Sequence, residues 1–383
     1  MSNVVESVEE ITAPEVSKLR QFLVWALPVA FTTGWAVFVL ASGHVERVLD
    51  NWRAALTMVF GSFVAGSTPQ GGGAVAFPVF TKILEIPAEV ARSFSLSIQA
   101  TGMVMAAVSI LLAGRKVDWK AIKLGVAGGT IGMLFGLFVL GDPDTAFWSS
   151  RIDDAYVKVS FTIAIFAVAV IVRMCSTRET RFDHVQHWGR RAVFLMLVFA
   201  VGGGVFSSLA GSGIDVLLFV FIVLVADVTP KVAIPTSIIS MAALSLIGFA
   251  IVGLLDGQLN VGLNEAGTEV VSVAGEAFGP EAATRFDLFG IWLAATPIVV
   301  WGAPLGAWVA SKVSERTVIR FVATMAILEV LTTAFFLDRL RTDLWLSVYF
   351  GVGLVAIYFV VQRLDRLSAW IMNEEPAAAD ATT

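Results

Sequence analysis

Long apolar stretches separated by short polar loops occupy most of the chain. Eight of these stretches have about 20 to 26 residues, enough for a helix to cross the hydrocarbon core of a bilayer. They cover residues 19–41, 88–113, 119–140, 155–174, 230–255, 286–310, 317–337 and 344–364. The pattern therefore predicts an all-α polytopic membrane protein with eight full spans.

Two further apolar stretches, residues 52–84 and 190–226, are interrupted near their centres. The first contains the string GSTPQGGG at residues 66–73, and the second contains SSLAGSGID at residues 207–215. Glycine and proline weaken a helix, and lipid cannot satisfy the backbone groups that a break exposes. Each interrupted stretch thus predicts a re-entrant helical hairpin whose broken tip lies inside the protein.

The two breaks belong to an internal repeat. Adding 142 to the residue number carries Gly61, Gly71, Phe77 and Ser95 onto Gly203, Gly213, Phe219 and Ser237 without a gap. Paired interrupted segments of this kind are typical of transporters, in which they mark the binding site. We predict one transmembrane domain at residues 19–364, composed of repeats at 52–174 and 190–337 and flanking spans at 19–41 and 344–364. Residues 1–18 and 365–383 are predicted to be cytoplasmic tails.

The distribution of charge sets the predicted topology. If both broken segments return to the face from which they entered, most lysines and arginines lie in loops on one side, which the positive-inside rule assigns to the cytoplasm. Both termini are then cytoplasmic, and the protein lies in the cell's inner membrane. The two repeats are inverted, and their tips meet near the midplane. A homodimer is compatible with this layout, and the sequence does not decide it.

Composition excludes several functional classes. With 57% hydrophobic and 15% charged residues, the chain shows no basic stripe with interleaved aromatic residues, so nucleic acid is not a predicted partner. The single cysteine, Cys175, excludes an internal disulfide or a cysteine metal cluster. The three histidines fall in predicted loops, away from any serine nucleophile in a span. We expect no enzymatic activity, no metal and no cofactor.

The broken tips predict a site for a small anion. A helix that begins at a glycine directs backbone N–H groups and the positive end of its dipole at the break. Neutral side chains beside the tips add hydrogen-bonding groups. The predicted substrate-binding residues are Ser67, Thr68, Gln70, Gly71, Gly72, Gly73, Ser95, Gln99, Gly211, Ser212, Gly213, Thr236, Ser237 and Ser240. The alternative is that these glycines and hydroxyls only allow close packing and cap broken helix ends.

Four charged residues complete the set of candidates. Arg92 and Lys231 follow the two broken segments, where they either attract anions to the mouths or extend toward lipid headgroups. Asp215 and Glu329 are acids within apolar segments, where acids are costly and usually functional. Proton coupling is one role for each acid. The alternatives are capping of a half-helix by Asp215 and bonding of a neighbouring helix by Glu329.

These strings, GSTPQGGG followed by Phe77-Pro78 and later AGSGID, resemble the sulfite exporter TauE/SafE family, also called TSUP. The resemblance implies export of small sulfur oxyanions such as sulfite, sulfoacetate or other organosulfonates. It also implies thiosulfate in distant relatives, although Cys175 alone does not match the cysteines associated with those carriers. The second break departs from a glycine triplet at Gly213-Ile214-Asp215, which makes Asp215 a stronger candidate for a functional residue. The expected function is export of a sulfur oxyanion; the alternatives are an anion channel and a proton-coupled uptake carrier for a related organic anion or thiosulfate.

Overall fold

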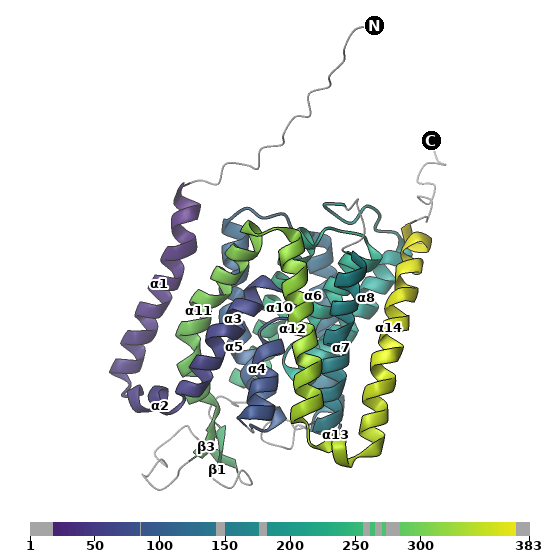
Figure 1. Cartoon of the computed structure of the whole chain (residues 1–383). Coiled ribbons are helices and arrows are strands. Elements are labelled where there is room, and N and C mark those ends of the chain that lie inside the picture. The colour runs from purple at the N-terminus through teal and green to yellow at the C-terminus, as the bar shows by residue number, and fades with distance from the viewer. Residues whose placement is uncertain are drawn as a thin grey trace.

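The computed structural model describes residues 18–84, 86–142, 150–175, 182–255, 261–264, 270–272 and 284–372. Helices dominate this part of the chain and stand side by side as one bundle (Figure 1). Nine helical segments of the described ranges are long and apolar enough to cross a membrane. The predicted all-α polytopic membrane fold is thus confirmed.

A helix is found at each of the eight predicted spans. These helices are α1 (Lys18–Ala41), α5 (Ala88–Leu112), α6 (Trp119–Phe135), α7 (Asp154–Cys175), α10 (Pro230–Gly248), α11 (Leu288–Lys312), α12 (Glu315–Phe336) and α14 (Leu344–Met372). Two of them continue into π-helical turns, α6 into η2 (Gly136–Leu140) and α10 into η4 (Phe249–Leu255). Because α14 continues past residue 364 to Met372, part of the expected C-terminal tail is helical.

Both interrupted stretches are broken helices. The first consists of α3 (Trp52–Ser67), α4 (Gly73–Pro78) and the π-helical turn η1 (Val79–Ile83). The second consists of α8 (Arg190–Ala210), α9 (Ile214–Val220) and the π-helical turn η3 (Phe221–Val225). The two first arms differ, because α8 has 21 residues and is the ninth span-length segment, whereas α3 has only 16. We call the connections at residues 68–72 and 211–213 the first tip and the second tip.

Each broken segment begins and ends at the same face of the bundle. Trp52 and Leu84, near the two ends of the first, line one surface pocket with Ile291 of α11. At the second, the Phe182 amide donates to Asp227 O (3.1 Å), which brings the chain before α8 beside the chain after η3. Lys312, at the far end of α11, lines a pocket with Asp183, so the two segments enter from opposite faces. The relation of the halves as two inverted repeats stays a prediction.

Shorter elements lie at the face where the first broken segment enters (Figure 1). They are α2 (Val45–Asp50), α13 (Arg339–Thr342) and an antiparallel sheet with the strand order β2-β1-β3. Its strands are β1 (Val261–Asn264), β2 (Val270–Ser272) and β3 (Thr284–Asp287). An ion pair between Arg47 and Asp287 joins α2 to the start of α11. The start of α1 and the end of α14 both lie at the opposite face, on opposite sides of the bundle (Figure 1).

Glycines bring each broken helix into close contact with a helix of the other half. Small residues allow helix backbones to approach in this way. At four points a Cβ atom on the glycine would overlap a backbone carbonyl: Gly66 against Ala303 and Gly306 against Phe63 between α3 and α11, and Gly132 against Val201 and Gly204 against Gly129 between α6 and α8. The packing is therefore reciprocal, and it holds both tips in the core of the bundle.

Candidate functional site

The two tips touch each other at Gly71 and Asp215. Gly71 has a φ of +65°, a conformation that glycine adopts without strain. A Cβ atom built on Gly71 would lie 2.5 Å from Asp215 Oδ2 and 3.4 Å from Gln99 Oε1. The structure thus brings together three of the predicted residues, one from the first tip, one from the start of α9 beside the second tip and one from α5.

Gln99 connects α5 to the second tip. Its Nε2 donates to the carbonyl oxygen of Gly211 at 2.8 Å and to Ser95 Oγ at 2.8 Å. Ser95 Oγ in turn donates to the same carbonyl at 3.3 Å. Gly211, with a φ of +77°, packs so closely on Ser95 that no Cβ would fit. The predicted placement of Ser95 and Gln99 beside a tip agrees with these contacts.

Side chains cap the start of α9 at the second tip. The Ile214 amide donates to Ser207 Oγ at 3.1 Å, and the Val216 amide donates to Asp215 Oδ1 at 3.0 Å. These amides were expected to face an anion, so capping, the alternative considered for Asp215, describes the contacts better. Ser207 was not among the predicted residues. Its position seven residues before Ile214 gave no local signal, because the contact forms only when the chain reverses at the tip.

The polar side chains of the first tip bond mainly to backbone. Ser67 Oγ donates to Phe63 O (2.8 Å), and Thr68 Oγ1 donates to Val64 O (2.9 Å). Gln70 reaches α12, where its Nε2 donates to Val322 O at 3.2 Å. Gly72 is buried, and Gly73 is the first residue of α4. An anion would have to draw Ser67 and Thr68 away from their own helix.

The predicted hydroxyls of α10 are also engaged with backbone. Ser237 Oγ donates to Ile234 O and Ser240 Oγ donates to Thr236 O. Thr236 Oγ1 accepts a bond from the amide of Asp118, just before α6, at 3.0 Å. The repeat thus gives different contacts in its two halves, since Ser95 reaches a tip and its equivalent Ser237 bonds within its own helix. A substrate role for the three α10 residues stays a prediction.

Four polar atoms near the tips are buried and lack a hydrogen-bond partner. Within the described residues these are Gln70 Oε1, Gln99 Oε1, Ser212 Oγ and Asp215 Oδ2. Buried polar groups are nearly always bonded, because leaving one unpaired costs about 1–3 kcal/mol. Two of them, Gln99 Oε1 and Asp215 Oδ2, converge beside Gly71, which indicates a place where a ligand, a proton or a second conformation completes the bonding.

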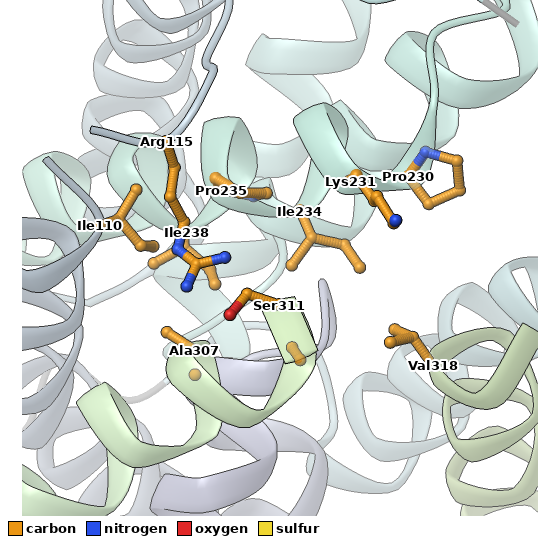
Figure 2. Close-up of a pocket in the computed structure, with 12 residues that line it drawn as sticks. Ile110, Arg115, Pro230, Lys231, Ile234, Pro235, Ile238, Ala307, Ser311 and Val318 are labelled. Atoms are coloured by element: carbon orange, nitrogen blue, oxygen red, sulfur yellow. The ribbon is translucent and has the colours of Figure 1, made fainter. Parts of the chain in front are cut away.

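A cavity of about 80 Å³ reaches the last turn of α3 from the face opposite the sheet. Gly66, next to the first tip, lines it together with Arg115, Lys231 and Ser311. Figure 2 shows the Arg115 guanidinium extending toward Ser311 of α11, with the Lys231 ammonium on the same cavity. The other lining residues are mainly apolar: Ile110, Pro230, Ile234, Pro235, Ile238, Ala307, Ala310 and Val318.

The cavity adjoins a wider vestibule of about 800 Å³ that shares Arg115, Lys231 and Ser311 with it. Lys116 and Lys312 also line this vestibule, and the one acid among its described lining residues, Asp183, forms an ion pair with Lys116 (2.6 Å). Burial lowers the pKa of Arg115, which is nonetheless so basic that the guanidinium stays charged at neutral pH. Positively charged side chains therefore predominate in the vestibule. Arg115 and Ser311 were not predicted, since sequence placed them only in or near a loop.

Arg92 and Glu329 lie inside the protein. Arg92 is 2% exposed, so it is neither at an open mouth nor among headgroups, and both expectations for its position were wrong. Packing of α5 among other helices encloses it, which position in the chain alone does not reveal. Glu329 Oε1 accepts from Thr162 Oγ1 of α7 at 3.0 Å and from Thr333 Oγ1 at 3.3 Å. Those contacts agree with the bonding role for Glu329; proton coupling there stays a prediction.

The described residues contain no group of three His, Cys, Asp or Glu side chains arranged to hold a metal ion. The sequence model of the sulfite exporter TauE/SafE family matches residues 54–333. No curated protein and no solved structure matches the chain. The matched range contains both tips, the cavity lining and both broken segments, apart from the first two residues of α3. The chain therefore belongs to the sulfite exporter TauE/SafE family, whose members are membrane transporters of sulfur anions such as sulfite.

Proposed function

We propose that the protein exports a small sulfur oxyanion, sulfite or an organosulfonate such as sulfoacetate, across the inner membrane. The anion enters the basic vestibule, passes Arg115 and Lys231 in the cavity, and reaches the two tips near the midplane. The observation that carries this proposal is the cavity itself, which joins a cationic entrance to Gly66 beside the first tip. The predicted tip residues then bind the anion once the tips separate.

Charge supports an anionic substrate. Of the described residues, four cations, Arg115, Lys116, Lys231 and Lys312, and one carboxylate, that of Asp183, line the vestibule. A cleft lined mainly by one sign of charge raises the local concentration of the opposite ion and speeds its binding.

The direction of transport follows from the proposed topology. With the vestibule in the cytoplasm, the substrate approaches from inside the cell. Moving one negative charge outward through an inside-negative potential releases roughly 2.3 kcal/mol per 100 mV. Export therefore needs no coupled ion. A channel and a proton-coupled uptake carrier for a related organic anion or thiosulfate are the alternatives.

Flux from proteoliposomes tests the proposal and its alternatives together. Vesicles are loaded with sulfite, sulfoacetate, sulfate or thiosulfate, and efflux is followed with and without an imposed potential. We expect saturable efflux of sulfite or sulfoacetate that accelerates when the potential pulls anions outward from the vestibule side. Efflux that rises linearly without saturation indicates a channel. Flux that requires a proton gradient indicates the uptake carrier, and absence of flux for every anion contradicts the proposal.

Neutralising Lys231 should slow capture of the anion. We expect Lys231→Gln to lower the initial rate at low anion concentration by about fivefold, because one of four vestibule charges is lost. The loss should shrink at high salt, which screens exposed charges. Lys120→Gln is the matched control, since Lys120 lies over the Trp188 ring rather than along the vestibule. Equal rates for the two variants would show that the vestibule charges do not recruit the substrate.

A further inference from the structure

Two hydrogen-bond acceptors face each other where the tips meet. Asp215 Oδ2 and Gln99 Oε1 both lie within 3.4 Å of one point beside Gly71, the position that a Cβ atom would take. Both atoms are buried, and neither has a hydrogen-bond partner. The exposed fraction is 0% for Asp215 and 2% for Gln99, so bulk solvent does not reach them.

The contacts around each side chain fix which atoms face the junction. The Gln99 amide cannot turn over without losing two bonds, because its Nε2 donates to Gly211 O and to Ser95 Oγ. Its Oε1 is therefore held toward Gly71. At Asp215, the Val216 amide occupies Oδ1, which leaves Oδ2 for the junction.

A charged Asp215 does not fit this arrangement. An ionised carboxylate only accepts hydrogen bonds, and so does an amide oxygen, so the two would repel in a place that excludes water. A protonated carboxyl donates one hydrogen bond and carries no charge. One proton on Oδ2 therefore satisfies both acceptors at once.

No cation of the described residues contacts the Asp215 carboxylate, because its Oδ1 bonds to the Val216 amide and its Oδ2 has no hydrogen-bond partner. The groups beside Oδ2, Gly71 of the first tip and Gln99 of α5, are uncharged.

We infer that Asp215 and Gln99 form a proton-operated latch, in which a proton on Asp215 Oδ2 bonds to Gln99 Oε1 and holds the start of α9 against α5, where both lie beside Gly71 of the first tip. When the proton leaves for water, the carboxylate and the amide oxygen repel, and the second tip moves away from α5 and from the first tip. The cycle forms and breaks only the O–H bond of the Asp215 carboxyl, and water takes up the proton. A metal cation suits the junction less well, because hard cations take six or more oxygen ligands, whereas two side-chain oxygens of the described residues lie nearest this position beside Gly71.

The latch rests on the proposed function in one respect only: if the protein transports an anion, opening of the tips during transport releases a proton. It is tested without any anion. A Cys175→Ser background removes the only native thiol. Ser212→Cys then places a reporter in the second tip at a side chain that is 0% exposed and has no hydrogen-bond partner. The measurement is the rate at which N-ethylmaleimide labels this thiol in proteoliposomes.

Asp215→Asn provides the reference, because the asparagine amide donates to Gln99 Oε1 at every pH and keeps the latch closed. Dividing the labelling rate of the Asp215 protein by that of the Asn variant removes the pH dependence of the thiol itself. We expect this ratio to be near one at about pH 5 and about tenfold higher at about pH 9, a factor equal to the loss of one buried hydrogen bond. A ratio that does not change with pH overturns the latch.

Further variants locate the proton and its partner. Gln99→Met removes the acceptor while keeping an unbranched side chain, and we expect fast labelling at both pH values. Glu329→Gln changes the other buried acid, which bonds to Thr162 and Thr333, and should leave the ratio unchanged. A ratio that no longer changes with pH in Glu329→Gln would assign the proton to Glu329 and overturn the proposal.

Replacing sodium chloride with choline chloride at constant pH separates the proton from a metal ion. We expect the same ratio in both salts, and protection that depends on sodium would overturn the proton as the ligand. Size-exclusion profiles of each variant establish that it is folded. A protein that labels as expected but moves no sulfur anion retains the latch and loses the proposed function, so the two failures are distinguishable.

Discussion

At the residue scale, Gly71 is the point on which the junction of the tips depends. Its left-handed backbone and its contact with Asp215 both require the absence of a Cβ atom. Gly211 combines the same two requirements against Ser95. The conformation of the tips therefore depends on the absence of a Cβ atom at Gly71 and Gly211 as much as on the polar groups around them.

Gly71→Ala should destabilise the protein by about 2 kcal/mol, because a left-handed conformation is strained in any residue with a Cβ and the new methyl meets Asp215 Oδ2. The measurement is the thermal unfolding midpoint in detergent. Gly34→Ala on α1 is the control, since a Cβ there meets nothing within 4 Å. The control should raise stability slightly, because alanine favours helix over glycine. Equal effects of the two substitutions would contradict the strain at Gly71.

Sequence reasoning predicted part of this junction. The broken strings identified Gly71 and Asp215, the span that follows the first hairpin supplied Gln99, and the repeat placed these segments at a common centre. It did not find Ser207, which caps α9 across the reversal of the chain, or the burial of Arg92. Both depend on which helix lies beside which, and one sequence does not encode that in local spacing.

At the element scale, the packing partner of a glycine run decides whether it breaks a helix. Residues 71–73 end one helix and start another, whereas Gly202, Gly203 and Gly204 remain inside α8. The second run packs tightly on other helices, with Gly204 against Gly129 of α6. The first run follows Pro69, whose ring cannot continue the helix. Counting glycines alone would not distinguish the two.

Gly132→Ala tests the close contact between α6 and α8. A Cβ at this position would overlap the Val201 carbonyl, and backbone cannot move aside as a flexible side chain can. We expect a loss of about 1–3 kcal/mol, the usual range for overpacking. Gly351→Ala on α14 serves for comparison, because nothing lies within 4 Å of its Cβ position. A Gly132→Ala protein as stable as the comparison variant would show that the helices separate at little cost.

The long elements were predictable and the short ones were not. Each of the eight spans is apolar and long enough to cross the hydrocarbon core of a bilayer, so hydropathy alone identifies it. The four residues of α13, the six of α2 and the strands of the small sheet are too short for any periodicity to stand out. The π-helical turns that end α6 and α10 also carry no distinct apolar pattern.

At the scale of the whole molecule, the face that carries the sheet is joined by ion pairs between distant segments. Arg339 of α13 donates to both carboxylate oxygens of Asp153, at 2.7 and 2.8 Å, and so connects the start of α7 to the turn between α12 and α14. Arg47 and Asp287 join α2 to α11 at the same face. These pairs tie the outermost helices to the bundle.

Asp153→Asn should lower stability at neutral pH and leave it unchanged in acid. The bonds from Arg339 hold the pKa of Asp153 below its usual range, so the stabilisation is present above about pH 4 and disappears as the pH falls through the lowered value. The effect should be small, because the pair is exposed. Unfolding midpoints at neutral and acidic pH provide the measurement. Asp338→Asn is the control, as its pair with Arg341 is longer, at 3.8 Å, and it should show less pH dependence.

The reciprocal contacts of α3 with α11 and of α8 with α6 determine which parts can travel as rigid bodies. Each broken helix packs closely against a helix of the other half. Neither half of the sequence can therefore move alone without breaking one of these helix contacts. The moving units must cut across the halves, one built on α3 and α11 and the other on α6 and α8. A gene split between α7 and α8 should accordingly yield two fragments that are insoluble when made separately and that fold only when they are synthesised together.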